Sequence, residues 1–329
     1  MTKLRSRTPS IDIRQVHYFM MLAEYGTISK AADALGLAQP SLSEHIARLE
    51  RKLNTKLAIR GPRGVTLTEA GRLLVREGHI LIEAAENLAS GLQGLGEEMS
   101  GNVSVALPPS LSALLSVPLA ETLHLEAPGI RMRIAEGLTG HILDWVEQDI
   151  VDVGFVYTSP PSSAFQSVPV LREEVFLVCA YDNIPVEADE TGAYVIDAQQ
   201  LGTLPLVMPS LPHTARRELD RYAKASGLDL NVVMEIDSLT QIVEMVSRAS
   251  AYTFLPHASV AHAVDAGKLA LVRIANPSFS RTTYLTRKRA RPASMASLKV
   301  EEVINQILRE LVDKYDLHAE IIGPAGGLH

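Results

Sequence analysis

The chain of 329 residues is 47% hydrophobic and 21% charged with a formal net charge of −7, the balance of an ordinary globular protein long enough for two domains. No run of 18 uncharged apolar residues occurs, which excludes a membrane-spanning helix, and the single cysteine, Cys179, excludes an intramolecular disulfide and a zinc cluster. Residues 1–10 are basic but lack a following apolar stretch, so we expect a disordered leader rather than a signal peptide, and a cytoplasmic protein.

Charge is distributed unevenly along the sequence. Residues 1–75 hold 12 Lys and Arg against 6 Asp and Glu, whereas the remainder holds 19 basic and 32 acidic residues. A basic N-terminal part on an acidic body is expected when one domain meets phosphates and the other avoids them. The asymmetry therefore favours nucleic acid as a partner over a chance variation of the surface.

Three short helices are predicted near the N-terminus. Apolar residues at helical spacing indicate a first helix over 11–25 and a second over 28–35, each followed by a glycine. Thr27 stands at the N-cap of the second helix, and Pro40 lies in the first turn of a third, which runs to about Leu53. Three short helices with a glycine in the tight turn before the third predict a helix-turn-helix.

A wing and a long helix follow. Two short β-prone arms surround the sequence GPRG at 61–64, which predicts a β-hairpin wing. A helix over 68–95 then carries Leu74, Leu81 and Leu88 at seven-residue intervals, the pattern of a seam that pairs with another helix. Because a lone helix of this length has nothing of its own against which to bury that seam, we predict that it dimerises the chain.

From residue 102 the pattern changes to alternating strands and helices, after a glycine-rich hinge. The hinge glycines follow a helix rather than a strand, so they do not fit a nucleotide-binding loop. Two sets of elements of similar size predict two α/β lobes with mostly parallel sheets and a cleft between them. The predicted segments are a winged helix-turn-helix at 11–67, a linker helix and hinge at 68–100, a domain at 101–316 with lobe I at about 101–170 and 275–316 and lobe II at about 171–274, and a tail at 317–329.

The N-terminal segments resemble the LysR family of transcription regulators. The sequence AADALGLAQPSLSEHIARLERKL, the wing and the TLTEAG entry into the linker helix occur in the order and at the spacing of that family. The segments GNVSVALPPSLS, EGLTGHILDWV and DSLTQIVEMV are similar to its branch of nitrogen-assimilation and sulfur-starvation regulators. The resemblance covers nearly the whole chain. It implies an α+β multidomain protein in which a winged helix-turn-helix and a long linker helix precede a two-lobed α/β, periplasmic-binding-protein-like effector domain.

The resemblance also implies partners. It predicts that the chain binds double-stranded promoter DNA as a homodimer or homotetramer, and that RNA polymerase is a further partner. A small molecule is expected to close the cleft between the lobes and change the bend of the DNA.

The outward positions of the third helix are the predicted base-reading residues. In a helix-turn-helix these positions enter the major groove. The amide of Gln39 suits adenine, Ser43 suits several base edges, and Pro40 suits a thymine methyl. Glu44 departs from the basic or amide residue often found there, although a carboxylate can accept from cytosine N4. The alternative for Gln39 and Ser43 is helix capping and solvation.

Five further residues are predicted to contact phosphates, which positions the domain without reading sequence. The alternative is a solvated basic loop. These residues are Thr27, Lys30, Arg48, Arg60 and Arg63.

Hydroxyl groups at the ends of strands mark the predicted effector site. Ligands of α/β folds bind at the carboxyl ends of strands, where the first turns of helices offer free amides. Such groups suit a small polar metabolite, and we expect an anionic one, although each hydroxyl alone also suits an ordinary helix cap. The predicted contacts are Ser110, Thr139, Ser210, Ser238 and Thr240, with Leu255 and Pro256 behind them.

The remaining candidates favour structural roles. No histidines stand at HxxxH or HExxH spacing, so neither a metal site nor a resident cofactor is expected. Cys179 is interpreted as a small core residue, which has no second thiol for peroxide sensing. Trp145 and Tyr157 are assigned to a lobe core, and the basic run 287–289 to a solvated surface.

Three alternatives to a ligand-responsive regulator are considered by what the sequence would have to contain. The first is a ligand-independent regulator whose lobes serve oligomerisation, and a plugged rather than open, hydroxyl-lined cleft would indicate it. An enzyme with an appended DNA-binding segment is disfavoured because the sequence has no nucleophile elbow, metal cluster or phosphate loop after a strand. A solute-binding transport protein is disfavoured by the missing export signal. The sequence therefore predicts a DNA-binding regulator that is not an enzyme.

Overall fold

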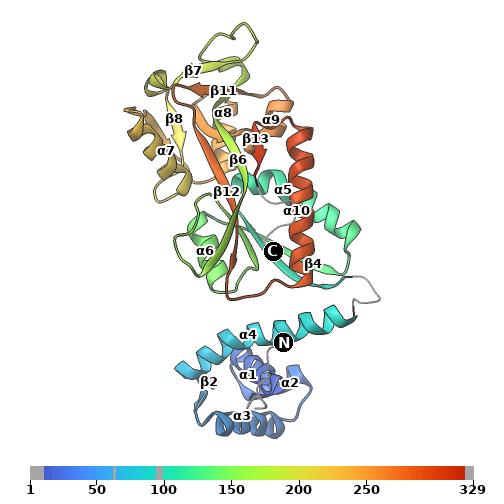
Figure 1. Cartoon of the computed structure of the whole chain (residues 1–329). Helices are drawn as coiled ribbons and strands as arrows, with labels where there is room; N and C mark the ends of the chain where they lie inside the picture. Colours follow the sequence, from blue (N-terminus) through green and yellow to red (C-terminus); the bar gives the residue numbers. More distant parts are fainter. Residues whose placement is uncertain (1–10, 62–63, 94–98, 323–329) are drawn as a thin grey trace. The chain divides into compact units, whose positions relative to one another are not determined.

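The computed structural model describes residues 11–61, 64–93 and 99–322, in two compact units divided after Leu95 (Figure 1). The predicted leader at 1–10 and Arg63 lie outside the described residues. No described helix combines the length and apolar character that crossing a bilayer requires.

The N-terminal unit confirms the predicted winged helix-turn-helix. Gly26 and Gly36 end the first two helices in the left-handed conformation, which glycine adopts without a steric penalty. The Thr27 hydroxyl accepts the Lys30 N–H at 3.3 Å and caps the second helix. The elements are α1 (Ile13–Tyr25), α2 (Ile28–Leu35), α3 (Gln39–Leu53), and an antiparallel wing of β1 (Ala58–Gly61) and β2 (Gly64–Leu67).

A buried carboxylate fixes the base of the wing. Glu50, near the end of α3, accepts the N–H groups of Leu57 at 2.9 Å and Ala58 at 3.3 Å, and the Lys56 ammonium at 2.6 Å. Burial alone would raise the pKa of Glu50, but these hydrogen bonds outweigh it and hold the pKa below its ordinary value. Glu50 therefore ties the end of α3 to the start of the wing.

The long helix α4 (Glu69–Gln93) begins against the wing. A Cβ atom on Gly71 would lie 2.1 Å from the Leu57 carbonyl oxygen, so only glycine permits this approach. Leu74 packs partly against the core of the unit, whereas Leu81 and Leu88 are 38% and 66% exposed. The predicted dimerisation seam is thus left without a partner over its second half within the described chain.

Two long strands join the lobes of the C-terminal unit. Strand β6 (Phe165–Ala180) pairs antiparallel with β12 (Ser280–Lys288), and Figure 1 shows them crossing side by side through the middle of this unit. They lie in one nine-stranded sheet with the order β4-β3-β5-β12-β6-β11-β7. The prediction of mostly parallel sheets is wrong. The chain passes between the lobes once in each direction, so the two connecting strands run antiparallel and the sheet is mixed.

Lobe I packs helices on both faces of its part of this sheet. Its core is formed largely by β3, α5 and α10, and strand β13 pairs with β6 inside the segment predicted as a tail. The elements are β3 (Gly101–Leu107), α5 (Pro109–Glu126), β4 (Ile130–Glu136), α6 (Thr139–Glu147), β5 (Val153–Val156), α10 (Met295–Lys314) and β13 (Ala319–Ile321).

Lobe II surrounds the second half of β6, where the fully buried Cys179 confirms the prediction of a core residue. Its elements are the short 3-10 helices η1 (Tyr181–Asn183), η2 (Ala198–Thr203) and η3 (His257–Ser259), the helices α7 (Thr214–Ala225), α8 (Leu239–Ser247) and α9 (Ala261–Asp265), and the strands β7 (Val195–Asp197), β8 (Leu206–Met208), β9 (Val232–Glu235), β10 (Thr253–Pro256) and β11 (Leu269–Ala275).

The basic run at 287–289 is only in part the solvated surface that was predicted, because Arg289 is exposed whereas Arg287 is buried. Arg287 is buried and paired with Glu301 of α10, and Lys288 is paired with Asp149. Arg289 donates to the carbonyl oxygens of Ser163 and Phe165 at 3.0 and 3.1 Å. Because β12 lies between β5 and β6 inside the sheet, charges at its end are covered and require partners.

Candidate functional site

The outer face of α3 carries the predicted base-reading residues. Its inner face is buried through Leu42 and Leu49, which turns Gln39, Pro40 and Glu44 to solvent. Ser43, beside them, is half-buried. The face is therefore free to enter a groove as the sequence predicted.

Gln39 is held in place by the neighbouring helix. Its amide Nε2 donates to Ser29 Oγ of α2 at 2.9 Å, while the N-cap of α3 is Ala38, which makes no side-chain capping bond. Gln39 therefore does not serve as the cap of its helix. Ser29, which was not singled out from the sequence, orients the amide instead.

The predicted phosphate contacts differ in whether their side chains are exposed or already bonded within the fold. Lys30 and Arg48 are exposed, whereas the Thr27 hydroxyl is engaged as the cap of α2. Arg60 belongs to strand β1, but its side chain, like all of Arg63, lies outside what the structure describes.

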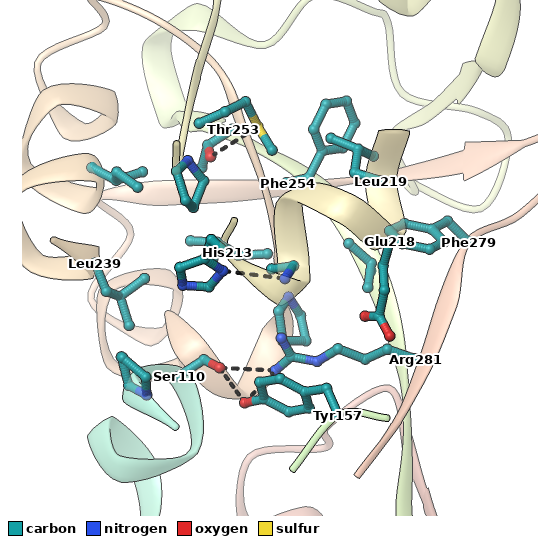
Figure 2. Close-up of a pocket in the computed structure, with 18 of the residues that line it drawn as sticks. Ser110, Tyr157, His213, Glu218, Leu219, Leu239, Thr253, Phe254, Phe279 and Arg281 are labelled. Atoms are coloured by element: carbon teal, nitrogen blue, oxygen red, sulfur yellow. Dashed lines mark hydrogen bonds between the residues drawn. The ribbon is translucent and has the colours of Figure 1, made fainter. Parts of the chain in front are cut away.

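A pocket lies between the two lobes of the C-terminal unit (Figure 2). Ser110 and Tyr157 reach it from lobe I, His213 and Glu218 from lobe II, and Arg281 from the crossing strand β12. The cavity measures about 60 Å³, and its wall is mainly apolar. Such a mixture of an apolar wall with a few converging polar groups is typical of small-molecule sites.

Arg281 is the centre of the polar groups in this pocket. Its Nε donates to Glu173 Oε2 at 3.0 Å, and its Nη2 donates to Ser110 Oγ at 3.0 Å and to the Tyr157 hydroxyl at 3.1 Å. Its Cζ lies 3.8 Å from the centre of the Tyr157 ring, in cation–π contact. Ser110 and Tyr157 are also hydrogen-bonded to each other, so one network joins lobe I to both crossing strands.

The pocket shifts the titration of three side chains. Burial raises the pKa of Tyr157 to about 12, although Arg281 opposes the shift, so the phenol stays neutral. Burial lowers the pKa of His213, which also makes its ring neutral, although Asp237 opposes it. Burial raises the pKa of Glu218 above its ordinary value, although Arg281 opposes it.

Three of the seven predicted effector contacts line the pocket, namely Ser110, Leu255 and Pro256. Thr139 lies behind it, where its Oγ1 accepts the Tyr157 N–H at 3.4 Å. The Thr139 side chain therefore holds the backbone of a pocket residue in place.

The other three predicted contacts are not among the lining residues. Ser210 donates its N–H and its hydroxyl to the Asp237 carboxylate at 2.9 and 2.6 Å. Ser238 and Thr240 belong to the start of α8, which contributes Leu239 to the wall instead.

Sequence reasoning missed the charged and aromatic members of the site. Tyr157 was assigned to a core, and the structure places it in the pocket wall. Arg281 was not singled out from the sequence, although it alternates with Thr283 and Leu285 on the buried face of β12. A charge at a core-facing position of a strand signals a buried partner or a site. The described residues contain no group of His, Cys, Asp and Glu that could hold a metal ion.

A winged helix-turn-helix joined by a long helix to a two-lobed α/β domain defines a DNA-binding transcription regulator. Residues 13–72 match the family model of the bacterial regulatory helix-turn-helix protein, lysR family, and residues 96–311 match that of the LysR substrate binding domain. The chain therefore belongs to the LysR family of transcription regulators, which are DNA-binding proteins and not enzymes.

Curated relatives match over nearly the full length. The chain is 25% identical over 295 residues to the nitrogen assimilation regulatory protein nac of Klebsiella aerogenes, covering 89% of this chain and 94% of that protein. It is 26% identical over 306 residues to the DNA-binding transcriptional dual regulator OxyR of Escherichia coli, covering 93% and 98%.

Solved structures share the fold. A cysteine mutant of OxyR from Corynebacterium glutamicum superposes with a TM-score of 0.63 at 20% identity, over 95% of this chain and 96% of that one. Full-length LysG from the same organism, with bound effector Arg, gives 0.59 at 15% identity, over 91% and 99%. CbnR complexed with its target DNA gives 0.52 at 19% identity, over 90% and 99%.

Proposed function

We propose that the chain senses a small molecule between its lobes and that occupancy alters its binding to, or its bending of, promoter DNA in the cytoplasm. The observation that carries this proposal is one cavity to which both lobes and a crossing strand contribute side chains. A ligand that prefers one arrangement of the lobes shifts the equilibrium toward it. A plugged cleft would have favoured the ligand-independent alternative. The bound arginine of the LysG structure supplies an analogy at the level of the fold.

The DNA-binding unit acts as a dimer in this proposal. The exposed Leu81 and Leu88 of α4 supply the apolar seam through which two chains pair. Two copies of α3 then enter major grooves at an interrupted palindrome, with half-sites one helical turn or a multiple apart. A tetramer that spans two such sites and contacts RNA polymerase completes the arrangement.

Base-edge and phosphate contacts are divided between the outer face of α3 and its surroundings. The base-reading role rests on the exposure of the first turns of α3 and on the bond that orients Gln39. The proposed base-reading residues are Gln39, Pro40, Ser43 and Glu44, and the proposed phosphate contacts are Thr27, Lys30, Arg48, Arg60 and Arg63.

Footprinting of the purified full-length protein on fragments of its own genome, at two salt concentrations, tests the DNA-binding part. Discrete sites that share a short interrupted palindrome and survive the higher salt are expected. Diffuse binding that disappears at moderate salt would contradict sequence-specific recognition, because it would reflect phosphate attraction alone.

A pocket-filling substitution tests the sensing part. In the source organism, Leu239→Trp is expected to abolish condition-dependent changes in transcripts from the footprinted promoters, since Leu239 lines the cavity. Thr240→Trp is the matched control, because the next residue along α8 does not line it. Unchanged regulation in Leu239→Trp would favour the ligand-independent alternative.

A further inference from the structure

The positive charge of Arg281 is already neutralised inside the protein. Its Nε bonds to Glu173, and the two side chains are only 7% and 3% exposed. Its Nη2 donates to Ser110 and Tyr157, and its flat face covers the Tyr157 ring. Thr283 adds a hydroxyl to the same Glu173 oxygen at 3.4 Å. An anionic ligand that bonded to Nε or Nη2 would have to displace one of these internal partners, and displacing Glu173 would leave that carboxylate buried without its counter-ion.

Glu218 brings a second carboxylate into the same space. It lies on α7 beside Leu219, and Figure 2 shows its carboxylate directed toward the Arg281 side chain. With the other described residues it makes neither a hydrogen bond nor an ion pair, in contrast to Glu173. Arg281 is thus flanked by two carboxylates and pairs with one of them, so the three groups together carry an excess negative charge.

Arg217 and Arg221 also attract Glu218, but they are exposed and do not line the cavity, and the other polar groups of the lining are neutral or negative. His213 accepts the Ala215 N–H at Nδ1 at 3.1 Å, and because its ring is neutral its proton stands on Nε2. Asp237 keeps its charge, held by two hydrogen bonds from Ser210, and contributes a further negative group at the rim. Among the described residues that line the cavity, Arg281 is the one side chain with a permanent positive charge, and it is already paired with Glu173.

Helix dipoles act in the opposite direction but are weaker. The first turns of α5, α7 and α8 face the cavity through Pro109, Ala215 and Leu239, and a helix N-terminus carries the equivalent of about half a positive charge. The first turn of α7 already donates to His213. When ionised, Glu218 carries a full charge at a partly buried position, where electrostatic interactions are less screened, although burial raises its pKa. The negative charge of Glu218 therefore has more influence than the helix dipoles on the charge that the pocket prefers in a ligand.

We propose that this pocket selects a ligand with a cationic nitrogen on a compact apolar body, and that Glu218 is the counter-ion and the specificity-determining residue. The inference rests on the proposed sensing function and departs from the anionic metabolite expected from the serines. The apolar body packs against Leu219, Ile242, Phe254 and Phe279, while the ammonium or guanidinium group replaces water at the Glu218 carboxylate. The hydroxyls of Ser110 and Tyr157 remain with Arg281.

Three probe molecules that share one branched hydrocarbon body test which ligand charge the pocket prefers. Isopentylamine, isopentanol and isocaproate differ only in carrying a cationic, neutral or anionic end. Their binding to the full-length protein is measured by calorimetry at neutral pH. The amine is expected to bind at least about tenfold more tightly than the carboxylate, the ratio that about 1.4 kcal/mol produces.

Glu218→Gln tests the residue assigned to this selection. It keeps the size of the side chain but removes the charge, so the preference for the amine is expected to fall to within about threefold of the other probes, or about 0.6 kcal/mol. Asp220→Asn, on the same helix but paired with Arg216 outside the cavity, is expected to retain the full preference.

The outcomes separate this inference from the function on which it rests. Tighter binding of isocaproate, absence of binding by all three probes, or a preference that survives Glu218→Gln would each overturn the cationic assignment. The first of these would leave small-molecule sensing intact. Unchanged promoter regulation in the pocket-filled Leu239→Trp protein would instead remove sensing, even where the amine binds.

Discussion

The two units present their functional side chains in opposite ways. On the N-terminal unit the proposed base-reading residues follow one another in the first turns of α3, where Gln39, Pro40 and Glu44 are exposed. In the C-terminal unit the pocket collects Ser110, Tyr157 and Arg281, which are separated by up to 171 positions in the chain and buried against one another. A charge on the first surface is screened by water and salt, whereas Arg281 and Glu173 in the second are almost fully buried and depend on each other as partners.

An arginine is therefore expected to contribute differently to the free energy of unfolding in the two units. Arg48 is exposed and makes no hydrogen bond or ion pair with the other described residues, so we expect its loss to have little effect on folding. The loss of Arg281 is expected to have a large effect, because Glu173, Ser110 and Tyr157 are all arranged around it. Substitutions in both units test this difference.

The largest effect is expected for Arg281→Met. The substitution leaves Glu173 buried without its counter-ion, which costs about 3–5 kcal/mol of unfolding free energy. Arg273→Met is the control, because Arg273 pairs with Glu174 while 48% exposed and should cost under about 1 kcal/mol. Denaturant unfolding of both variants measures the difference. Equal losses would show that the burial of the Arg281 pair has no energetic consequence.

Gly71→Ala is expected to destabilise the N-terminal unit by about 3 kcal/mol. The added Cβ atom would lie 2.1 Å from the Leu57 carbonyl oxygen, so α4 or the wing must move. Thermal unfolding and operator binding should both deteriorate. Gly140→Ala, where no atom lies within 4 Å of the new methyl group, should be neutral or slightly stabilising. A wild-type melting temperature for Gly71→Ala would refute the close contact between linker helix and wing.

Arg48→Ala should weaken DNA binding without unfolding the protein. The loss of one phosphate contact lowers the slope of log Kd against log salt by about 0.9, and does so for specific and unrelated DNA alike. Titrations at several salt concentrations measure the slope. Arg131→Ala removes an exposed arginine from the other unit and should leave the slope unchanged. An identical slope in both variants would exclude Arg48 from the phosphate contacts.

The smallest effect is a change in the pH dependence of stability for Glu218→Gln. Because burial raises the pKa of Glu218 in the folded state, folding favours the protonated acid, despite the opposing Arg281, Arg221 and Arg217. Wild-type stability is then lost as the pH rises from 4.5, the ordinary value, through the raised pKa. The glutamine variant lacks this loss, so its advantage should grow across that window and then level off.

Melting temperatures from pH 4 to pH 8 test this expectation. Glu218→Asp retains a carboxylate and should keep the downward trend of the wild type. Parallel profiles for the wild type and Glu218→Gln would show that the carboxyl titrates alike in the folded and unfolded chain.

Most of the N-terminal unit was predictable from the sequence, and so was the order of lobes. Helix caps, glycine stops and apolar spacing are local, so the boundaries at Thr27, Gly36 and Leu53 follow from a few neighbouring residues. The exposed face of α3 follows from the same periodicity. The alternation of strands and helices after residue 101 predicted two α/β lobes for a comparable reason.

The pocket was predictable only in part. The rule that ligands bind at strand ends predicted three residues that line the pocket, namely Ser110, Leu255 and Pro256. The same rule also selected Ser210, whose hydroxyl donates to Asp237 instead. Side-chain hydroxyls at helix starts look alike in a sequence, whether they face a ligand or a neighbouring carboxylate. Their partners decide between the two roles, and those partners lie far away in the chain.

The amino-acid sequence alone predicts the winged helix-turn-helix, the apolar seam of the linker helix and the membership in the LysR family. Three other features depend on the tertiary structure, namely the mixed sheet, the burial of Arg287 and the pairing of Arg281 with Glu173. Local patterns set which face of an element turns inward, because that depends on spacing alone. The pairing of two buried charges 108 positions apart depends on how strands β6 and β12 cross, and their register is fixed only when both lobes close around them.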